Sequence, residues 1–147
     1  MPRILFLCTG NSARSQMAEA LLPLIGGKDF VTASAGTHPA GLNPITVEAL
    51  REIGVEWQDR RSKPVEEVLG QVFDYVITVC DRAKASCPVL PGPHTPLHWS
   101  FNDPAAAPAE RRLEEFRRVR DEIVDQLCAF LLNQCQLLPA ALRCYRC

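Results

Sequence analysis

The sequence has neither a long apolar run nor a strong charge of one sign. No hydrophobic stretch approaches the roughly 20 residues that a membrane-spanning helix needs. The apolar run near the N-terminus is short and is not followed by the small-residue cleavage site of a secretory signal. The formal net charge of −1 gives no reason to expect binding to nucleic acid or to an anionic membrane. We therefore expect a cytoplasmic protein whose partners must be inferred from local sites.

The sequence also has no histidine pattern of the kind that binds a metal, and no internal repeat. His38, His94 and His98 are too irregularly spaced to form a ligand set, and His98 is better explained as a packed or hydrogen-bonded residue. With 147 residues the chain is long enough to bury a core without disulfides or metals. Its seven cysteines are an odd number, so complete internal pairing is impossible. In a reducing compartment any disulfide is expected to be transient and catalytic.

Apolar runs and helical spacings alternate along the chain. The runs predict strands at residues 3–7, 30–36, 72–80 and, more weakly, 93–100. The spacings predict helices at residues 12–25, 43–54, 65–69 and 109–132. This alternation predicts an α/β domain with a parallel sheet between helices. The arginines of the last helix alternate with acidic residues, which indicates a solvated face with helical ion pairs rather than a nucleic-acid surface.

Residues 8–15, CTGNSARS, stand where the first strand meets the first helix. In parallel sheets ligands bind beyond the carboxyl ends of the strands, where Cys8 is expected. The loop after it can turn its backbone N–H groups toward the positive end of the helix dipole and so bind a tetrahedral oxyanion. We predict that anion-binding loop to consist of Thr9, Gly10, Asn11, Ser12 and Ala13.

Each residue type around this loop suits the same chemistry. Arg14 offers a forked cation to two oxygens of the anion, and Cys8 is expected to be a nucleophilic thiolate in that field. Gly10 is expected to give the loop its conformational freedom, Asn11 tolerates a left-handed conformation, and the Ser15 hydroxyl can donate to the thiolate. The alternative is a buried apolar Cys8 and an exposed Arg14, but the glycine, asparagine and serine favour a functional loop.

The segment CTGNSARSQMAEA resembles the loop of the low-molecular-weight tyrosine phosphatase superfamily, and its SQMAE continuation resembles the thiol-coupled arsenate reductase branch. Three further motifs continue the resemblance in order over residues 3–132: SAGTHPAGLNP, TVCDRAKASCP and HWSFNDPA. The resemblance implies a flavodoxin-like open sheet of four parallel strands, in the order 2-1-3-4, with helices on both faces. Residues 1–132 would form this domain, and residues 133–147 a cysteine-containing tail.

Two further cysteines, Cys80 and Cys87, stand at the end of the third strand and seven residues later. In a continuous helix their Cα atoms would be about 10 Å apart, which exceeds the reach of a disulfide. Joining them requires the short segment between them to unwind, and a short, mainly exposed helix melts at low cost. Cys8 and Cys80 end strands that are neighbours in the order 2-1-3-4. A disulfide relay explains this placement better than two buried thiols do.

Asp103 precedes a proline in the loop before the last helix. From the residues alone, a turn or capping aspartate is the better interpretation. The resemblance assigns it instead as the general acid above the anion. Phosphatases of the superfamily usually have a tyrosine beside this Asp-Pro pair, whereas Ala105 follows here. The entrance is therefore poorly suited to phosphotyrosine.

Related reductases bind potassium through asparagine, glutamate, serine and aspartate side chains. Asn11, Glu19 and Ser34 match the first three positions, but Lys63 stands at the fourth. We predict that the Lys63 ammonium replaces the ion, and we expect no tightly bound cofactor and no metal. The alternative is an exposed lysine without this contact. The remaining cysteines, at positions 128, 135, 144 and 147, have no assigned role, and a zinc site in the tail is a weak hypothesis.

The resemblance implies reduction of arsenate to arsenite through an arseno-cysteine on Cys8 and a relay through Cys80 and Cys87. An external thiol would reset the enzyme, with thioredoxin favoured over a glutaredoxin or a small thiol. We expect a monomer. One alternative is hydrolysis of phosphomonoesters, for which Cys8, Arg14 and Asp103 would suffice. Another is a non-catalytic protein that binds oxyanion or arsenite and senses redox state.

Overall fold

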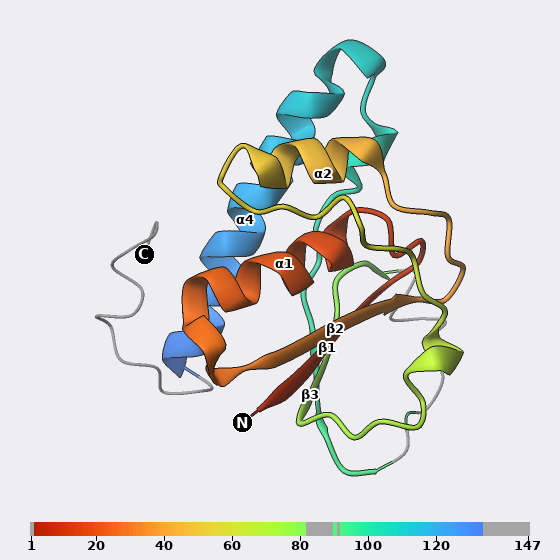
Figure 1. Cartoon of the computed structure of the whole chain (residues 1–147), viewed down its shortest axis with the longest axis vertical. Coiled ribbons are helices and arrows are strands. Elements are labelled where there is room, and N and C mark those ends of the chain that lie inside the picture. The colour runs from red at the N-terminus through yellow and green to blue at the C-terminus, as the bar shows by residue number, and fades with distance from the viewer. Residues whose placement is uncertain (1, 82–89, 91, 134–147) are drawn as a thin grey trace.

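The computed structural model describes residues 2–81, 90 and 92–133. Figure 1 shows a single sheet with the long helices stacked over one of its faces. The strands are β1 (Arg3–Cys8), β2 (Val31–Gly36), β3 (Tyr75–Thr78) and β4 (Thr95–His98). The α-helices are α1 (Arg14–Gly26), α2 (Pro44–Arg51) and α4 (Arg112–Asn133). Single 3-10 turns form η1 (Gly27–Asp29), η2 (Val65–Glu67), η3 (Pro104–Ala106) and η4 (Ala109–Arg111).

The four strands are all parallel and lie in the order β2-β1-β3-β4, which confirms the predicted topology. Cys8 is opposite Gly36 on β2, and Leu7 is opposite Thr78 on β3. A hydrogen bond from Val79 N–H to the Leu7 carbonyl, 2.8 Å long, extends the pairing by one residue beyond β3. The carboxyl ends of β1 and β3 therefore meet at one edge of the sheet. Cys8 is the last residue of β1, and Cys80 comes two residues after the end of β3.

The two faces of the sheet have separate cores. On the face seen in Figure 1, α1 packs on β1 and β2, and α4 packs against α1 and α2. The apolar face of α1 predicted from its spacing is buried, as are Phe116 and Ile123 of α4. On the opposite face η2 and the chain that follows it cover the strands, with a core of Leu5, Leu7, Ala35, Val65, Val68, Phe73, Val76 and Leu90. The central strand β1 is thus apolar on both sides, as a covered parallel strand requires.

Several predicted boundaries differ from the observed ones. The first helix begins at Arg14 rather than Ser12, because residues 9–13 form the loop that curls around the Cys8 sulfur. The predicted helix 65–69 is only the 3-10 turn η2, and the predicted strand 72–80 pairs only over Tyr75–Thr78. α2 begins as predicted, with the Asn43 side chain accepting a hydrogen bond from the Ile45 N–H at 2.9 Å.

The prediction of a uniformly solvated arginine face on the last helix is wrong for Arg120. That side chain is 10% exposed and donates to the Ala49 carbonyl at 2.9 Å and to Glu52 at 3.0 Å. Arg117 also binds Glu52, and its hydrogen bonds lower the pKa of that carboxyl below the ordinary 4.5. The two arginines therefore join α4 to α2. Arg118 makes the helical ion pairs that were predicted, with Glu115 and Glu122.

Some predictions fall on residues outside the described part of the chain. These include the helix expected after Cys80, Cys87 itself, and the tail cysteines at 135, 144 and 147. Cys128 lies on α4 and is buried. Within residues 2–81, 90 and 92–133, no helix is both long enough and apolar enough to cross a membrane.

Candidate active site

The backbone carbonyl groups of the loop after β1 accept hydrogen bonds from the segment that follows β2. The N–H groups of Thr37, His38 and Ala40 donate to the carbonyls of Cys8, Thr9 and Gly10, at 3.1, 2.8 and 2.9 Å. The Ser12 carbonyl accepts from Asn43 N–H at 3.1 Å and from the Thr46 hydroxyl at 2.7 Å. Because the C=O and N–H of a trans peptide point in opposite directions, the N–H groups that follow these carbonyls point the other way. One of them, the Asn11 N–H, donates to the Cys8 sulfur at 3.1 Å.

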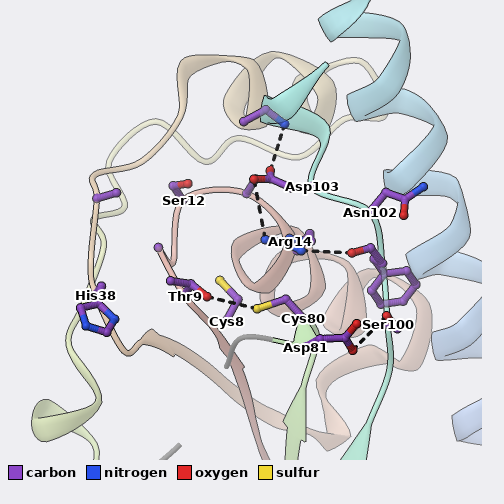
Figure 2. Close-up of a pocket in the computed structure, with 15 residues that line it drawn as sticks. Cys8, Thr9, Ser12, Arg14, His38, Cys80, Asp81, Ser100, Asn102 and Asp103 are labelled. Atoms are coloured by element: carbon purple, nitrogen blue, oxygen red, sulfur yellow. Dashed lines mark hydrogen bonds and ion pairs between the residues drawn. The ribbon is translucent and has the colours of Figure 1, made fainter. Parts of the chain in front are cut away.

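Cys8 lies at the base of this loop and is 2% exposed. Its sulfur is 3.1 Å from the backbone nitrogen of Asn11, which donates to it, and 2.8 Å from the Ser15 hydroxyl. Figure 2 shows the sulfur directed into the pocket below Arg14. Two hydrogen-bond donors and the N-terminus of α1 therefore converge on one sulfur atom, which is the environment that stabilises a thiolate.

Asn11 is the structural centre of the loop. It is fully buried and has a φ of 48°, the left-handed conformation predicted for it. Its side-chain oxygen accepts from the Lys63 N–H at 2.8 Å and from Gln16 at 3.1 Å. Its side-chain nitrogen donates to Ser15 at 2.8 Å and to Ser34 at 2.9 Å. Since Ser15 already accepts from Asn11, its own proton is free to be donated to the Cys8 sulfur.

The role predicted for Gly10 is wrong. Gly10 is not among the glycines with a positive φ, so the loop does not use the conformational freedom of a glycine there. A Cβ at Gly10 would lie 3.4 Å from the Ala40 Cβ, which is ordinary contact. The glycine that the loop requires is Gly36, where a Cβ would lie 2.6 Å from the Thr9 carbonyl oxygen and 3.0 Å from Asn11. Gly36 ends β2 and lets the loop lie directly against the neighbouring strand.

Arg14 begins α1 and spans the upper part of the pocket. One guanidinium nitrogen, Nη1, donates to the Phe101 carbonyl at 3.0 Å, and Nη2 is 4.0 Å from the Asp103 carboxylate. Asp103 also accepts from the Ala105 N–H at 3.0 Å and caps η3. The sequence left a turn residue and a residue at the anion pocket as alternatives for Asp103. The structure shows one side chain that caps η3 and also lies beside Arg14. Half of the Asp103 side chain is exposed, so it can exchange protons with solvent.

Cys80 lies beside Cys8 at the base of the same pocket (Figure 2). It is 3% exposed, and its sulfur is 3.4 Å from the Thr9 hydroxyl. Thr9 directly follows Cys8, so the first loop residue contacts the second thiol. The structure therefore brings Cys8, Cys80, Arg14 and Asp103 to one cavity of about 500 Å³. Its described lining is Cys8, Thr9, Gly10, Ser12, Ala13, Arg14, His38, Ala40, Cys80, Asp81, Ser100, Phe101, Asn102, Asp103 and Ala105.

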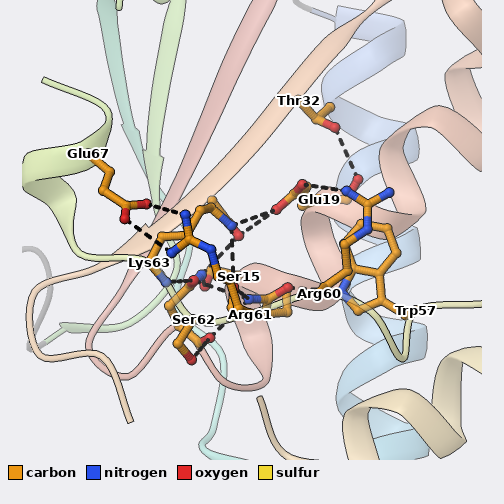
Figure 3. Close-up of polar contacts among 12 residues, drawn as sticks. Ser15, Glu19, Thr32, Trp57, Arg60, Arg61, Ser62, Lys63 and Glu67 are labelled. Atoms are coloured by element: carbon orange, nitrogen blue, oxygen red, sulfur yellow. Dashed lines mark hydrogen bonds and ion pairs between the residues drawn. The ribbon is translucent and has the colours of Figure 1, made fainter. Parts of the chain in front are cut away.

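A buried carboxylate lies behind the loop (Figure 3). Glu19 is 8% exposed and accepts from the Ser34 hydroxyl at 2.6 Å. The Lys63 ammonium lies 3.9 Å from one carboxylate oxygen of Glu19, and an Arg60 guanidinium nitrogen lies 4.0 Å from the other. Asn11, Glu19, Ser34 and Lys63 therefore form one cluster. A buried carboxylate needs such cationic partners because desolvation penalises its charge.

Three residues in this region were not singled out from the sequence. Gln16 is fully buried and joins Asn11 to the indole N–H of Trp57, which donates to the Gln16 side-chain oxygen at 2.8 Å. Ser62 donates to the Asn11 carbonyl at 2.7 Å. A glutamine at a buried position of an amphipathic helix was the available signal for Gln16. Ser62 and Trp57 carry no comparable signal, because the fold alone brings Ser62 to Asn11 and Trp57 to Gln16, across 51 and 41 residues of sequence.

Comparisons with known proteins agree with this geometry. The family model for low-molecular-weight phosphotyrosine protein phosphatases matches residues 3–140. An arsenate reductase of Halalkalibacterium halodurans is 42% identical over 129 residues, which cover 86% of this chain and 93% of the relative. Arsenate reductase 1 of Staphylococcus epidermidis is 43% identical over 120 residues, which cover 82% of this chain and 88% of the relative.

Solved structures extend these findings. An arsenate reductase in a phosphate-binding state has a TM-score of 0.73 at 26% identity, covering 90% of this chain and 98% of that one. A thioredoxin-dependent arsenate reductase of Corynebacterium glutamicum has a TM-score of 0.67 at 32% identity, covering 91% of this chain and 64% of that one. The fold and the site together define a protein of the low-molecular-weight phosphotyrosine protein phosphatase family, to which this chain belongs. Within that family it belongs to the arsenate reductase branch.

Proposed function

We propose that this enzyme reduces arsenate to arsenite with three thiols in sequence, using Cys8, Cys80 and Cys87, and that thioredoxin resets it. The observation that carries the proposal is the placement of Cys80 at the base of the anion pocket, with its sulfur 3.4 Å from the hydroxyl of the residue next to Cys8. A phosphatase needs one thiol in this pocket. A second thiol in contact with the loop is what a redox reaction requires.

In the first step the Cys8 thiolate attacks arsenic while the loop N–H groups and Arg14 hold the arsenate oxygens. An As–O bond breaks, and Asp103 protonates the departing oxygen, which leaves as water. The product is an arseno-cysteine in which arsenic is still pentavalent. The position of Asp103, 4.0 Å from Arg14 at the pocket rim, supports this role.

In the second step the Cys80 thiolate attacks the Cys8 sulfur. The S–As bond breaks with its electron pair moving to arsenic, so arsenite leaves and a Cys8–Cys80 disulfide remains. Cys87 then attacks Cys80, which releases the Cys8 thiolate and forms a Cys80–Cys87 disulfide. A dithiol protein such as thioredoxin supplies the two electrons that reduce this disulfide. The net reaction consumes arsenate and two thiols and yields arsenite, water and a disulfide.

The test is release of arsenite by the full chain in the presence of thioredoxin, thioredoxin reductase and NADPH. One NADPH should be oxidised for each arsenite formed, and Cys8→Ser should abolish both. If arsenite forms equally well with a glutaredoxin system and not with thioredoxin, the reductase activity stands and the thioredoxin assignment is wrong. If no reductant supports arsenite formation, the proposal fails.

A single substitution separates the relay from the second candidate function, hydrolysis of phosphomonoesters, which the anion loop with Arg14 and Asp103 also favours. On the relay proposal, Cys87→Ser should release one arsenite per enzyme and then stop, with Cys8 and Cys80 joined. If hydrolysis is the physiological reaction, the same variant should keep full turnover of an aryl phosphate. If the protein only binds oxyanions as a sensor, neither product should appear.

We also propose that the Lys63 ammonium supplies the positive charge that potassium supplies in related reductases. Its distance of 3.9 Å from Glu19 supports this, as does the chain of hydrogen bonds from Glu19 through Ser34, Asn11 and Ser15 to Cys8. The Ser34 hydroxyl donates to Glu19, and the Lys63 ammonium places a positive charge beside the same carboxylate oxygen. The donor and acceptor directions of these hydrogen bonds, from Glu19 to Cys8, then depend on this charge.

Exchanging potassium for sodium should leave the activity of the unmodified enzyme unchanged. Lys63→Asp should make activity depend on potassium and not on sodium. Arg61→Ala is the matched control, because Arg61 is adjacent in sequence but pairs with Glu67 at 2.9 Å. A potassium requirement in the unmodified enzyme would refute the replacement.

A further inference from the structure

A second polar cluster surrounds Asp81, which lines the pocket together with Cys80. His98 ends β4, directly opposite Thr78 at the end of β3. Its Nδ1 is 2.7 Å from the Thr78 hydroxyl, and its Nε2 is 2.8 Å from an Asp81 carboxylate oxygen. The Ser100 hydroxyl donates to the same oxygen at 3.2 Å. The carboxylate of Asp81 is thus held by two donors from β4 and the loop that follows it.

The donor and the acceptor in each of these hydrogen bonds follow from which atoms carry a proton. An ionised carboxylate only accepts, so the Nε2 of His98 must carry the proton that it shares with Asp81. In the neutral ring Nδ1 then accepts from the Thr78 hydroxyl. In the protonated ring Nδ1 donates to that hydroxyl, whose proton can turn to the Leu97 carbonyl, 3.4 Å away. The contact with Asp81 is therefore satisfied in both states of the histidine.

Asp81 directly follows Cys80, so the contacts of the Asp81 side chain affect the position of the Cys80 thiol. The backbone before Cys80 is fixed by the sheet, since Trp99 N–H donates to the Thr78 carbonyl at 2.8 Å. The backbone after Cys80 is fixed through the Asp81 side chain. We propose that His98 and Ser100 act as a clamp on Asp81 and that this clamp positions the Cys80 thiol against Cys8. The two are positioning residues and touch neither the anion nor the reacting sulfur.

The exposures of the side chains indicate a local effect rather than a global one. The His98 side chain is 22% exposed and that of Asp81 is 79% exposed, so the contact between them contributes little to the stability of the fold. Cys80, which the clamp flanks, is only 3% exposed. Opening the clamp should therefore release Cys80 from its buried position while the sheet stays intact.

The loop that carries the clamp also holds the anion site. Ser100 binds Asp81, the Phe101 carbonyl accepts from Arg14, and Asp103 faces Arg14. In Figure 2, Asp103 lies above Arg14, and Asp81 and Ser100 lie below it. The segment 100–103 thus contacts both Asp81, next to Cys80, and Arg14, next to the anion loop.

The first test measures how fast Cys80 in the reduced protein reacts with iodoacetamide, followed by mass spectrometry of tryptic peptides. Arg82 and Lys84 separate Cys80 from Cys87 in the sequence, so the two cysteines fall on different peptides. His98→Ala and Asp81→Ala should label Cys80 roughly three- to tenfold faster, the range expected for loss of one partly exposed, charge-assisted hydrogen bond. Asp81→Asn keeps the acceptor oxygen and should stay within about twofold of the unmodified protein.

His94→Ala is the matched control, because His94 lies just before β4, is partly exposed, and has its ring Nδ1 3.2 Å from the Gly92 carbonyl, which is not part of the clamp. It should leave Cys80 labelling unchanged. Thermal unfolding of every variant checks that the fold is retained. Equal labelling of Cys80 in all folded variants would overturn the clamp, as would faster labelling in Asp81→Asn equal to that in Asp81→Ala.

The catalytic consequence rests on the proposed function and has its own measurement. In a single turnover without external reductant, His98→Ala and Asp81→Ala should form the Cys8–Cys80 disulfide and release arsenite more slowly by the same factor as above. Their dissociation constant for inorganic phosphate should be unchanged, because the anion loop and Arg14 are intact. If the unmodified protein releases no arsenite, the proposed function fails while the labelling test of the clamp still stands. Normal arsenite release by variants with faster labelling would remove the clamp from catalysis.

Discussion

The Ser15 hydroxyl lies 2.8 Å from the Cys8 sulfur and also 2.8 Å from the side-chain nitrogen of Asn11. A hydroxyl that accepts from an amide on one side has its proton available for the other side. Ser34 stands in the same relation to Asn11 and donates its proton to Glu19. One asparagine therefore orients two hydroxyl groups, one toward the thiol and the other toward the buried carboxylate.

Ser15→Ala should slow the attack of Cys8 by about 10- to 100-fold, because it removes a hydrogen bond to a charged group. Ser34→Ala leaves the Ser15 bond in place and should have a smaller effect, within about fivefold. The measurement is the rate of Cys8 alkylation at neutral pH, together with arsenite release in a single turnover. Equal losses in the two variants would mean that the network acts only by supporting the fold.

The capping contact of Asp103 and its proposed role as proton donor can be separated by comparing two substitutions. Asp103→Asn keeps an oxygen that can accept from the Ala105 N–H, so η3 should remain capped, but it removes the acid. Asp103→Ala removes both. We expect both variants to lose about 10²- to 10⁴-fold in the rate of the first chemical step. Only Asp103→Ala should lose stability, by about 1 kcal/mol, as measured by urea unfolding. Full activity of Asp103→Asn would contradict its role as a proton donor.

Gly36→Ala tests the close approach between β2 and the anion loop. The added Cβ would lie 2.6 Å from the Thr9 carbonyl oxygen, which is backbone and cannot move aside without shifting the loop. We expect phosphate affinity to fall at least tenfold, measured by calorimetry. Gly70→Ala is the control, because a Cβ there meets nothing within 4 Å and Gly70 has no positive φ. If Gly36→Ala binds phosphate normally, the loop is more tolerant than the contact implies.

Glu52 connects acid stability to the contact between α2 and α4. Hydrogen bonds from Arg117 are the largest cause that lowers its pKa below the ordinary 4.5. Because the folded pKa is depressed, the stabilisation is present above pH 4.5 and is lost as pH falls through the lowered value. Glu52→Gln should therefore be less stable by about 1 kcal/mol at pH 7, and the difference should shrink below pH 4.5. Urea unfolding at pH 7 and pH 3 measures it. A difference that does not depend on pH would exclude the ion pair as the cause.

The sheet was predictable because its strands and helices are encoded by local patterns. Alternating apolar runs and helical spacings determine the element order, and the Asn43–Pro44 pair marks the start of α2. The boundaries were less predictable. Ser12 has the residue type of a helix N-cap, yet the helix begins at Arg14, since the loop bonds to residues 37–43 override local preference.

The sequence by itself determined the anion loop, because Cys8, Asn11, Arg14 and Ser15 lie within eight residues and their spacing sets their geometry. Only the tertiary structure decided what surrounds that loop. Gly36 and Ser62 contact it from another strand and another loop, and the His98–Asp81 pair forms next to Cys80. Their contacts depend on how the parallel strands align at their carboxyl ends, and that alignment is a property of the packed sheet that no local stretch of residues encodes.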